Sequence, residues 1–387
     1  MFKLISETNT RRKGVIKTKN GEIKTPFFMP DATRGFVKSI SGEDLKKSGV
    51  QPMVVNTYHL YLNPGMETIK KSGGINNFMN WSYPLLSDSG GYQVFSLIHK
   101  NPKLGKITED EVIFRSPVDG AKHILTPEKA IQIQFDLGVD MMVCLDDVPP
   151  NNYPEEKIKE AVERTIIWAQ RCKIEYEKQI KKRKISDSER PLLFGVIQGG
   201  KYGDLRKYCA DELVRLDFDG YGFGARHVDE NGVFMEDMIR ETAQMIPKDK
   251  LRFALGVGTP EDIARCVKMG WDIFDCVIPT REGRHGRLFV WDKQSEFSIF
   301  NFQFSNNFEI SNSKIQKFYN TININNEKFK EDFSSLDTHC DCELCENHSK
   351  SYLHHLFAIK DPLAQRLASM HNLKFYMDLM KELRYEK

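Results

Sequence analysis

Short apolar runs alternate with amphipathic stretches along the chain between about residue 50 and residue 290. The clearest amphipathic stretch is 155–176, where apolar residues recur every three or four positions, and this spacing predicts a helix with one buried face. A second helix is expected to begin after Thr259, because Pro260 follows this N-cap and Asp262 stands three residues beyond it. The apolar runs have the length of strands and read PMVVNTYHLYL, PLLSDSGG, MMVCLDD, LLFGVIQGG, GYGFGA, RFALGVG and DIFDCVIP.

These repeated strand-then-helix units predict an α/β fold with parallel strands, because a parallel connection needs a crossover segment. About eight such units in this length favour a (β/α)₈ TIM barrel over an open sheet. The sequence contains no GxGxxG fingerprint, which argues against a dinucleotide-binding fold.

Most of the apolar runs end in polar or glycine residues, and in a parallel barrel the carboxyl ends of all strands face one mouth. Asp275 is the most conspicuous, because it interrupts an apolar run and an ionised carboxylate is rarely buried unless it is paired or functional. Turn formation alone would explain any single Asp or Gly of this kind, but it explains several in register less well. We therefore expect a site at the mouth, formed by Asp88, Asp146, Gln198, Gly224 and Asp275.

Composition excludes several classes of protein. The chain is 40% apolar and 28% charged, which is typical of a globular protein, and its apolar runs are too short to span a membrane. The N-terminal segment has no apolar stretch of a secretory signal, so we expect a cytoplasmic protein with no membrane partner. The net charge of +2 neither indicates nor excludes nucleic-acid binding, which depends on local patches. We interpret the basic run 181–184 as a solvated helix end.

Five of the eight cysteines are scattered and predicted to be reduced, whereas Cys340, Cys342 and Cys345 form a C-x-C-x₂-C cluster. In a chain without an export signal such a cluster favours metal binding over disulfides. A tetrahedral structural zinc site needs a fourth ligand, and the local pattern does not choose among five histidines. These candidates are His339, His348, His354, His355 and His371.

The predicted organisation has three parts. Residues 1–292 form the barrel and carry the site at its mouth. Residues 293–332, rich in Asn, Ser and Phe without a helical period, form an atypical insertion and connection. Residues 333–387 form a zinc-binding subdomain with the closing C-terminal helices.

Four separated motifs resemble those of the bacterial-type tRNA-guanine transglycosylases of the queuosine pathway. They are LLSDSGGYQVFSL, FGVIQGG, FDCVIPTREGRHG and the cysteine cluster with a His 26 positions after Cys345. The resemblance covers nearly the whole chain. It implies a zinc-containing TIM barrel that exchanges guanine at position 34 of GUN-anticodon tRNAs for a 7-deazaguanine, either preQ1 or queuine. It further implies a homodimer with one structural Zn²⁺ per subunit.

The resemblance assigns roles residue by residue. Asp275 would be the nucleophile on ribose C1′ and Asp88 the general acid/base, which suits a retaining double displacement through a covalent Asp–ribose intermediate. The zinc ligands would be Cys340, Cys342, Cys345 and the distant His371. The base would be bound by Asp146, Gln198, Gly224, Tyr92 and Leu255, with Tyr92 stacking on a flipped-out base. Arg281, Arg284 and Asn56 would contact tRNA, and an aromatic dimer cluster would include Phe78, Tyr352 and His355, with His348 in place of a Trp.

Three segments depart from the bacterial pattern. Val148 stands where bacterial members have Cys, as in eukaryotic relatives that accept the larger base queuine. Ala225, Arg226 and His227 replace a GGL turn, and MPDATRG replaces a commoner Val-Gly-Thr version. We therefore hypothesise that the incoming base is not the usual aminomethyl precursor preQ1, or that it is bound differently. The segment from Lys293 to about residue 320 is expected to be a surface insertion rather than a tRNA contact.

Two alternatives remain at this point. The chain could act on another polynucleotide, as DNA-directed or archaeal-type relatives do. It could instead be a non-catalytic tRNA-binding subunit. The presence of both Asp88 and Asp275 argues against the second alternative, because a silent subunit has no need of a desolvated carboxylate.

Overall fold

The computed structural model describes residues 1–8, 11–117, 120–292 and 318–384. The chain divides into two compact units, each assembled from separate segments. The barrel unit comprises Met1–Phe36, Gln51–Val257 and Cys266–Asp275, and the C-terminal unit comprises Val37–Val50, Gly258–Arg265 and Cys276–Lys387. Within the described residues no helix has the length and apolarity needed to cross a membrane.

The barrel unit is built on a sheet of eight strands, and six pairs of neighbouring strands in it run parallel. A parallel bridge between Asp31 and Val54, next to the Ala32 N–H donating to Val54 O at 2.8 Å, joins the two edges of the sheet. The predicted (β/α)₈ barrel is therefore confirmed. In spatial order the strands are β4 (Phe27–Pro30), β14 (Ile273–Cys276), β13 (Leu251–Ala254), β12 (Gly220–Phe223), β11 (Leu192–Ile197), β10 (Met141–Val143), β6 (Leu85–Asp88) and β5 (Met53–Asn56).

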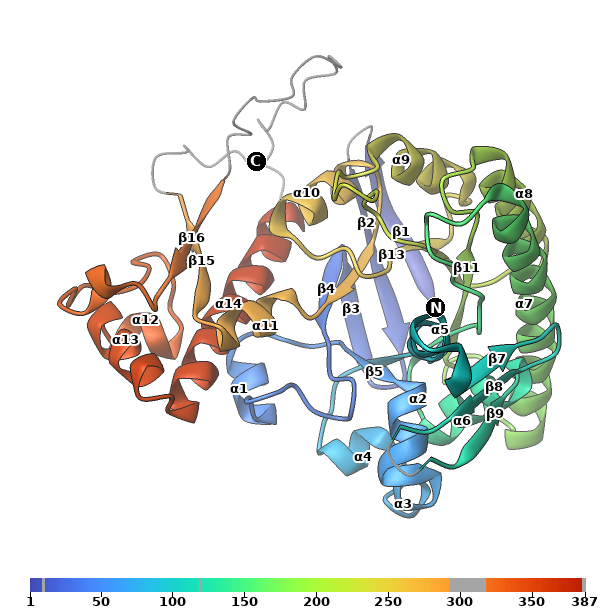
Figure 1. The fold of residues 1–387 in the computed structure, drawn as a ribbon, viewed down its shortest axis with the longest axis horizontal. Helices are drawn as coiled ribbons and strands as arrows, with labels where there is room; N and C mark the ends of the chain where they lie inside the picture. Colours follow the sequence, from blue (N-terminus) through green and yellow to red (C-terminus); the bar gives the residue numbers. More distant parts are fainter. Residues whose placement is uncertain (9–10, 118–119, 293–317, 385–387) are drawn as a thin grey trace. The chain divides into compact units, whose positions relative to one another are not determined.

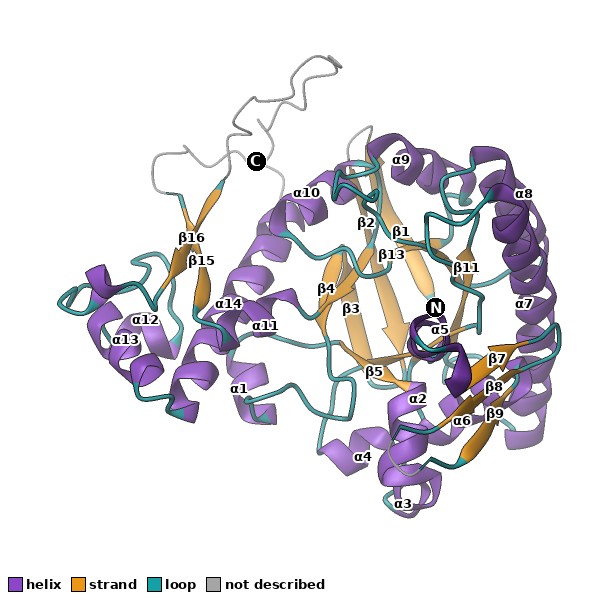
Figure 2. Ribbon diagram, viewed as in Figure 1, coloured by secondary structure: helices purple, strands orange, loops and turns teal. Residues whose placement is uncertain are grey.

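Helices of the barrel unit lie outside its strands (Figure 2). The helix predicted at 155–176 is present and longer, since α7 runs to Arg183 and ends at Lys184 in the left-handed conformation, so the basic run is a helix end as expected. Neighbouring helices α7, α8 and α9 follow one another around the unit (Figure 1). The helices are α2 (Thr57–Leu60), η1 (Tyr61–Gly65), α3 (Met66–Lys71), α4 (Ile75–Met79), α5 (Gly91–Lys100), η2 (Pro102–Leu104), α6 (Pro127–Leu137), α7 (Glu155–Arg183), α8 (Gly203–Arg215) and α9 (Glu236–Met245).

Two small antiparallel sheets complete the barrel unit. The first, formed by β1 (Phe2–Thr8), β2 (Arg11–Thr18) and β3 (Gly21–Thr25), places Ile16 and Ile23 in one apolar cluster with the first residues of several barrel strands. This sheet therefore closes the amino-terminal end of the barrel and leaves the carboxyl end for the site. The second sheet is β7 (Gly105–Ile107), β8 (Val112–Arg115) and β9 (Lys122–Leu125).

The C-terminal unit has its own apolar core, to which the cysteine cluster and the last helix both contribute. Strands β15 (Arg287–Trp291) and β16 (Tyr319–Asn323) pair antiparallel, and most of the predicted insertion between them lies outside the described residues. The helices are α1 (Gly42–Lys47), α11 (Ile278–Arg284), η3 (Glu327–Phe329), α12 (Glu343–Asn347), α13 (Lys350–Ala358) and α14 (Pro362–Arg384).

Helix α10 (Pro260–Lys268) belongs in part to each unit. It begins directly after Thr259, as predicted, and the Asp262 N–H donates to the Thr259 hydroxyl at 3.3 Å. The Thr259 hydroxyl in turn donates to the Asp262 carboxylate at 2.7 Å. The first of these bonds satisfies an orphan N–H of the first helical turn and the second holds the capping hydroxyl in place, which is why the sequence signal located the helix start.

Candidate active site

The predicted site residues of the barrel unit all lie at or just beyond the carboxyl ends of its strands. Asp88 ends β6, and Asp275 is the third residue of β14. Parallel strands present these ends at one mouth, so the structure gathers residues that are up to 187 positions apart (88 to 275). The remaining members follow the strands between them: Asp146 beyond β10, Gln198 beyond β11, Gly224 beyond β12 and Leu255 beyond β13.

Asp88 is half-buried and surrounded by donors. The Asn56 amide donates to its Oδ2 at 2.6 Å, and the backbone N–H groups of Thr57 and Gly90 donate to Oδ1 at 3.3 and 3.0 Å. Burial, followed by the negative charge of Asp31, raises the pKa of Asp88 to about 7 despite these hydrogen bonds. Near neutral pH this carboxyl group can therefore either donate or accept a proton, which is what a general acid/base requires.

Asp275 is also half-buried, and one of its oxygens is held in place. The Gly256 N–H donates to Oδ1 at 2.9 Å, while Oδ2 accepts no hydrogen bond from any residue that the structure describes. Burial, followed by the charge of Asp31, raises the pKa of Asp275 to about 7. The carboxylate thus has a fixed orientation and a free oxygen, as a nucleophile needs.

Asp146 and Gln198 form a buried polar pair. The Gln198 amide donates to Asp146 Oδ2 at 2.7 Å, and burial raises the pKa of Asp146 to about 7. Gln198 Oε1 is buried without a hydrogen-bond partner among the described residues. Leaving such an acceptor unpaired costs about 1–3 kcal/mol, so it marks a place where a ligand donor fits. Gly224 lies against this pair, because a Cβ there would stand 2.5 Å from Gln198 Cδ.

The neighbouring Asp147 has a different role from Asp146. Arg164 donates to Asp147 Oδ2 at 2.5 Å and to the Glu109 carboxylate at 2.6 Å. Asp147 is therefore part of an ion-pair network that ties α7 to the loop after β10, and Asp146 is left to face the site.

Tyr92 and Leu255 flank the mouth at different depths. Tyr92, on the first turn of α5, is 59% exposed and lines a hollow of about 390 Å³ together with Tyr58, His59 and Gln93. Leu255 is half-buried and packs against the barrel core. An exposed aromatic ring at the mouth can cover a flat ligand with little rearrangement.

Sequence reasoning missed Arg206, which is buried in α8 and has no carboxylate partner among the described residues. Its guanidinium donates to the carbonyl oxygens of Ile197, Gly200 and Gly224 at 3.0, 2.7 and 3.2 Å. Burial lowers the pKa of Arg206 to about 10, so it stays charged at neutral pH. A signal existed: Arg206 occupies the buried phase of α8 with Cys209, Ala210 and Leu213.

We expect Arg206→Ala to lower the free energy of unfolding by about 3 kcal/mol, because three buried carbonyl groups lose their donor. The loops after β11 and β12, which hold Gln198 and Gly224, should shift relative to each other once they lose the donor that they share. Denaturant unfolding measures the loss of stability. Arg206→Lys retains a charge and part of the hydrogen bonding, so its free energy of unfolding should lie between those of Arg206→Ala and wild type. Equal stability of Arg206→Ala and wild type would contradict the assignment.

The loop that follows Val148 contacts the turn formed by Ala225 and Arg226. Asn151, three residues after Val148, donates to Arg226 O at 3.3 Å and accepts from the Arg226 N–H at 3.4 Å. Ala225 has φ +85°, a left-handed conformation that a non-glycine residue adopts only at a cost of about 1–2 kcal/mol.

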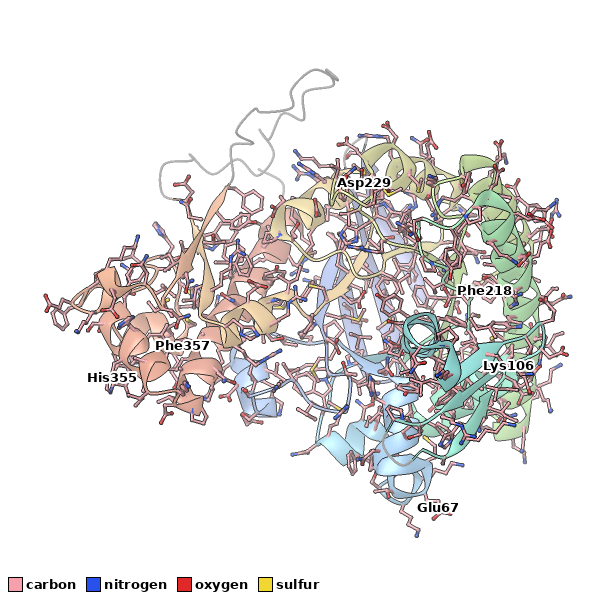
Figure 3. All side chains as sticks on the ribbon, viewed as in Figure 1. Glu67, Lys106, Phe218, Asp229, His355 and Phe357 are labelled. Atoms are coloured by element: carbon pink, nitrogen blue, oxygen red, sulfur yellow. The ribbon has the colours of Figure 1, made fainter. Side chains whose placement is uncertain are left out.

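The loop that follows is closed by its own hydrogen bonds. Asp229, labelled in Figure 3 in the loop between β12 and α9, accepts from the N–H groups of Asn231 and Val233. Burial and the charge of Arg226 lower the pKa of His227 to about 4, so this imidazole is neutral. Arg226 is therefore the exposed cation of this turn.

The C-terminal unit gathers four potential metal ligands. Ligand atoms of Cys340, Cys342, Cys345 and His371 all lie within 4.8 Å of one another. His371 Nδ1 is 3.5 Å from Cys342 Sγ and 3.3 Å from Cys345 Sγ, and its Nε2 is 2.7 Å from the carbonyl oxygen of Phe289. An Nε2–H donated to this carbonyl fixes the neutral tautomer whose Nδ1 lone pair faces the sulfurs. Three thiolates and one imidazole fit a closed tetrahedral zinc site.

The other candidate histidines lie elsewhere in the C-terminal unit. His354 Nδ1 is 2.8 Å from the Ile324 carbonyl, and His339 lies 3.6 Å from Asp337. His348 stacks on Tyr352 with ring centroids 4.9 Å apart, and His355 is exposed (labelled in Figure 3). Of the five candidate histidines, His371 is thus the one that lies with the three cysteines.

The residues expected to contact tRNA or a second subunit differ in their exposure and in their hydrogen-bond partners. Arg281 is exposed on α11 beside Glu282, at 3.5 Å, and Arg284 is half-buried on the same helix. Asn56 lies in the barrel unit, where its amide is already committed to Asp88. The exposed aromatic residues Phe78 and Tyr352, 42% and 38% accessible, are available for contacts with another chain.

Comparison with known proteins gives one consistent result. The family model of queuine tRNA-ribosyltransferase matches residues 7–386. A queuine tRNA-ribosyltransferase of Thermoanaerobacter pseudethanolicus is 42% identical over 384 residues, which cover 99% of this chain and 92% of the relative. Proteins of the same name from Thermodesulfovibrio yellowstonii and Francisella tularensis subsp. novicida are 40% and 41% identical, and the matches cover 99% of this chain and 90% and 93% of the relatives. The chain belongs to the queuine tRNA-ribosyltransferase family.

Proposed function

We propose that the chain is a tRNA-guanine transglycosylase, a pentosyltransferase that exchanges guanine 34 of GUN-anticodon tRNAs for a 7-deazaguanine. The observation that carries this proposal is the pairing of two kinds of group at one mouth. Asp88 and Asp275 are carboxyl groups with pKa raised to about 7, and Asp146 with Gln198 is a buried acceptor–donor pair. The first pair suits displacement at an anomeric carbon, and the second suits the edge of guanine.

Guanine presents two kinds of donor, N1–H and the 2-amino group, next to the acceptor O6. Asp146 accepts from the donors, while the second amide hydrogen of Gln198 is available for O6 and its unpaired Oε1 for a further donor. The glycine at 224 lets the backbone approach the flat ring. Tyr92 covers the base that has left its stack in the anticodon loop.

The exchange proceeds in two displacements. Asp275 Oδ2 attacks C1′, the C1′–N9 bond breaks, and its electron pair leaves with guanine, which takes a proton from Asp88. The incoming base then gives its N9 proton to the Asp88 carboxylate and attacks C1′, so that the ester bond to Asp275 breaks. Two inversions retain the configuration at C1′ and return both carboxyl groups to their starting states.

Cys340, Cys342, Cys345 and His371 would hold one Zn²⁺ per subunit. Bound there, the ion supplies a structural cross-link and no open coordination position. Arg281 and Arg284 are proposed to contact phosphates of the anticodon loop. Phe78, Tyr352 and His355 are proposed to lie in a homodimer interface.

The incoming base is proposed to be one other than preQ1, or to be bound differently from preQ1 in other members. With N9 at Asp275 on β14 and the amino edge at Asp146 on β10, position 7 of the ring faces the loops after β12 and β13. The loop after β12 is the one that carries Ala225 and Arg226, and it is joined through Asn151 to the segment of Val148. We expect queuine to compete with labelled guanine more strongly than preQ1 does. A clear preference for preQ1 would overturn this part of the proposal.

Labelled-guanine exchange tests the function itself. The wild-type protein should incorporate labelled guanine into an unmodified GUN-anticodon tRNA and fail with the same tRNA carrying adenine at position 34. Incorporation independent of position 34, or into DNA alone, would identify another polynucleotide as the substrate. Retention of tRNA on a gel without any incorporation would support a non-catalytic subunit.

A further inference from the structure

A third carboxylate, Asp31, lies at the mouth between the strands of the proposed nucleophile and acid/base. It follows β4, the neighbour of β14, where the Phe27 N–H donates to Asp272 O at 2.9 Å. On its other side Asp31 bridges Val54 of β5, two residues before Asn56. Thus Asp275 lies on the strand to one side of Asp31, and Asn56, which holds Asp88, lies on the strand to the other.

The carboxylate of Asp31 is fixed by a local turn. Its Oδ1 accepts from the Thr33 N–H at 2.8 Å and from the Thr33 hydroxyl, whereas Oδ2 accepts no hydrogen bond from the described residues. Such a turn needs one acceptor oxygen, which an Asn side chain would supply equally well. The turn therefore explains why residue 31 has a short side chain with an acceptor oxygen, but it does not explain why this side chain is an Asp and not an Asn.

The groups that face this charge come from four elements. Arg34 is on the same segment and is exposed, His59 comes from α2, Asp275 from β14 and Asp88 from β6. Asp31 makes no ion pair with Arg34 or His59 within the part of the chain that the structure describes. Its negative charge instead acts on both reacting carboxyl groups and raises the pKa of each.

We propose that Asp31 is a positioning residue for base exchange, whose fixed negative charge between the two reacting carboxyl groups keeps a proton at the mouth for the departing guanine. This inference rests on the proposed function. Exchange needs Asp275 ionised and Asp88 protonated at the same moment. Beside this fixed charge, Asp88 and Asp275 do not both ionise readily at neutral pH, so one proton is retained where the leaving base needs it.

Asp31→Asn tests this role, because it removes the charge and keeps an oxygen for Thr33. Without the charge the pKa of Asp275 and that of Asp88 both fall. The bell-shaped pH profile of kcat/KM for guanine exchange should therefore move to lower pH by roughly one unit. Relative to wild type, we expect about a threefold gain at pH 6 and about a tenfold loss at pH 8.

Two further variants make the experiment decisive. Asp187→Asn, at an exposed turn after α7, should leave the profile in place. Asp31→Ala should move the pH profile as Asp31→Asn does. Its melting temperature should be lower, because the turn also loses the acceptor oxygen. The Ala variant replaces Asp31→Asn in the test if the Asn variant does not fold. If the variants have lower activity but the acidic and basic limbs of the pH profile stay at the wild-type pH, Asp31 has only a structural role. Absence of exchange in wild type would instead refute the proposed function.

Discussion

Asp275→Asn should lose base exchange by a factor on the order of 10⁴ or more, together with all covalent capture of tRNA. An amide oxygen cannot displace guanine at C1′, yet it can still accept from the Gly256 N–H that now holds Oδ1 at 2.9 Å. The shape of the site is thus kept while its nucleophile is removed. Labelled-guanine incorporation and a denaturing gel for the tRNA adduct measure the two effects.

The same variant should be more stable than wild type at pH 8. The pKa of Asp275 is raised from an ordinary value of 3.8 to about 7 in the folded protein, so its ionisation opposes folding. Below pH 3.8 this carboxyl group is protonated in both the folded and the unfolded protein, so its ionisation does not change the free energy of unfolding. Between pH 3.8 and 7 the penalty grows, and above pH 7 it is fully present.

Thermal unfolding of both proteins at pH 4 and pH 8 checks this sign. A gain in stability at pH 8 combined with loss of exchange would show a carboxylate kept for chemistry at the expense of stability. Exchange at the wild-type rate by Asp275→Asn would remove this residue as the nucleophile, whatever the stability.

Removing the metal should unfold the C-terminal unit. Structural zinc contributes roughly 10–16 kcal/mol of apparent binding free energy at neutral pH, more than the stability of an ordinary domain. Here the ligands come from the segment 340–345 and from α14, and two of the cysteines lie in the apolar core of the unit. Without the ion three thiol groups and an imidazole would be left clustered beside that core.

Cys345→Ser is therefore expected to lose its zinc and the cooperative unfolding of the C-terminal unit, and a strong chelator should have the same effect on wild type. Metal content by atomic absorption and thermal unfolding followed by circular dichroism are the measurements. Cys172→Ala is the matched control, because this buried cysteine lies in α7 of the barrel unit and should keep one zinc per chain. Retention of stoichiometric zinc by Cys345→Ser would contradict the ligand set.

Local sequence patterns determined much of this protein. Helical spacing over 155–176 located α7, and the basic run 181–184 indicated where it ends, which the structure places at Arg183. The capping residues located the start of α10. Strand-length runs ending in Asp, Gln or Gly indicated a parallel barrel and its mouth, since residue type and strand period are properties of consecutive residues.

Only the tertiary structure decided which distant residues meet. Of the five candidate histidines, His371 lies beside the cysteine cluster. The position of its imidazole is fixed by the packing of α14 and by the Phe289 carbonyl, and not by its spacing of 26 residues from Cys345. It placed Asn56 on Asp88, and Asp31 between two carboxyl groups far away in the chain. Burial raises the pKa of Asp88 and that of Asp275 to about 7, and this burial is a property of the folded barrel that the residues next to each Asp in the chain do not determine.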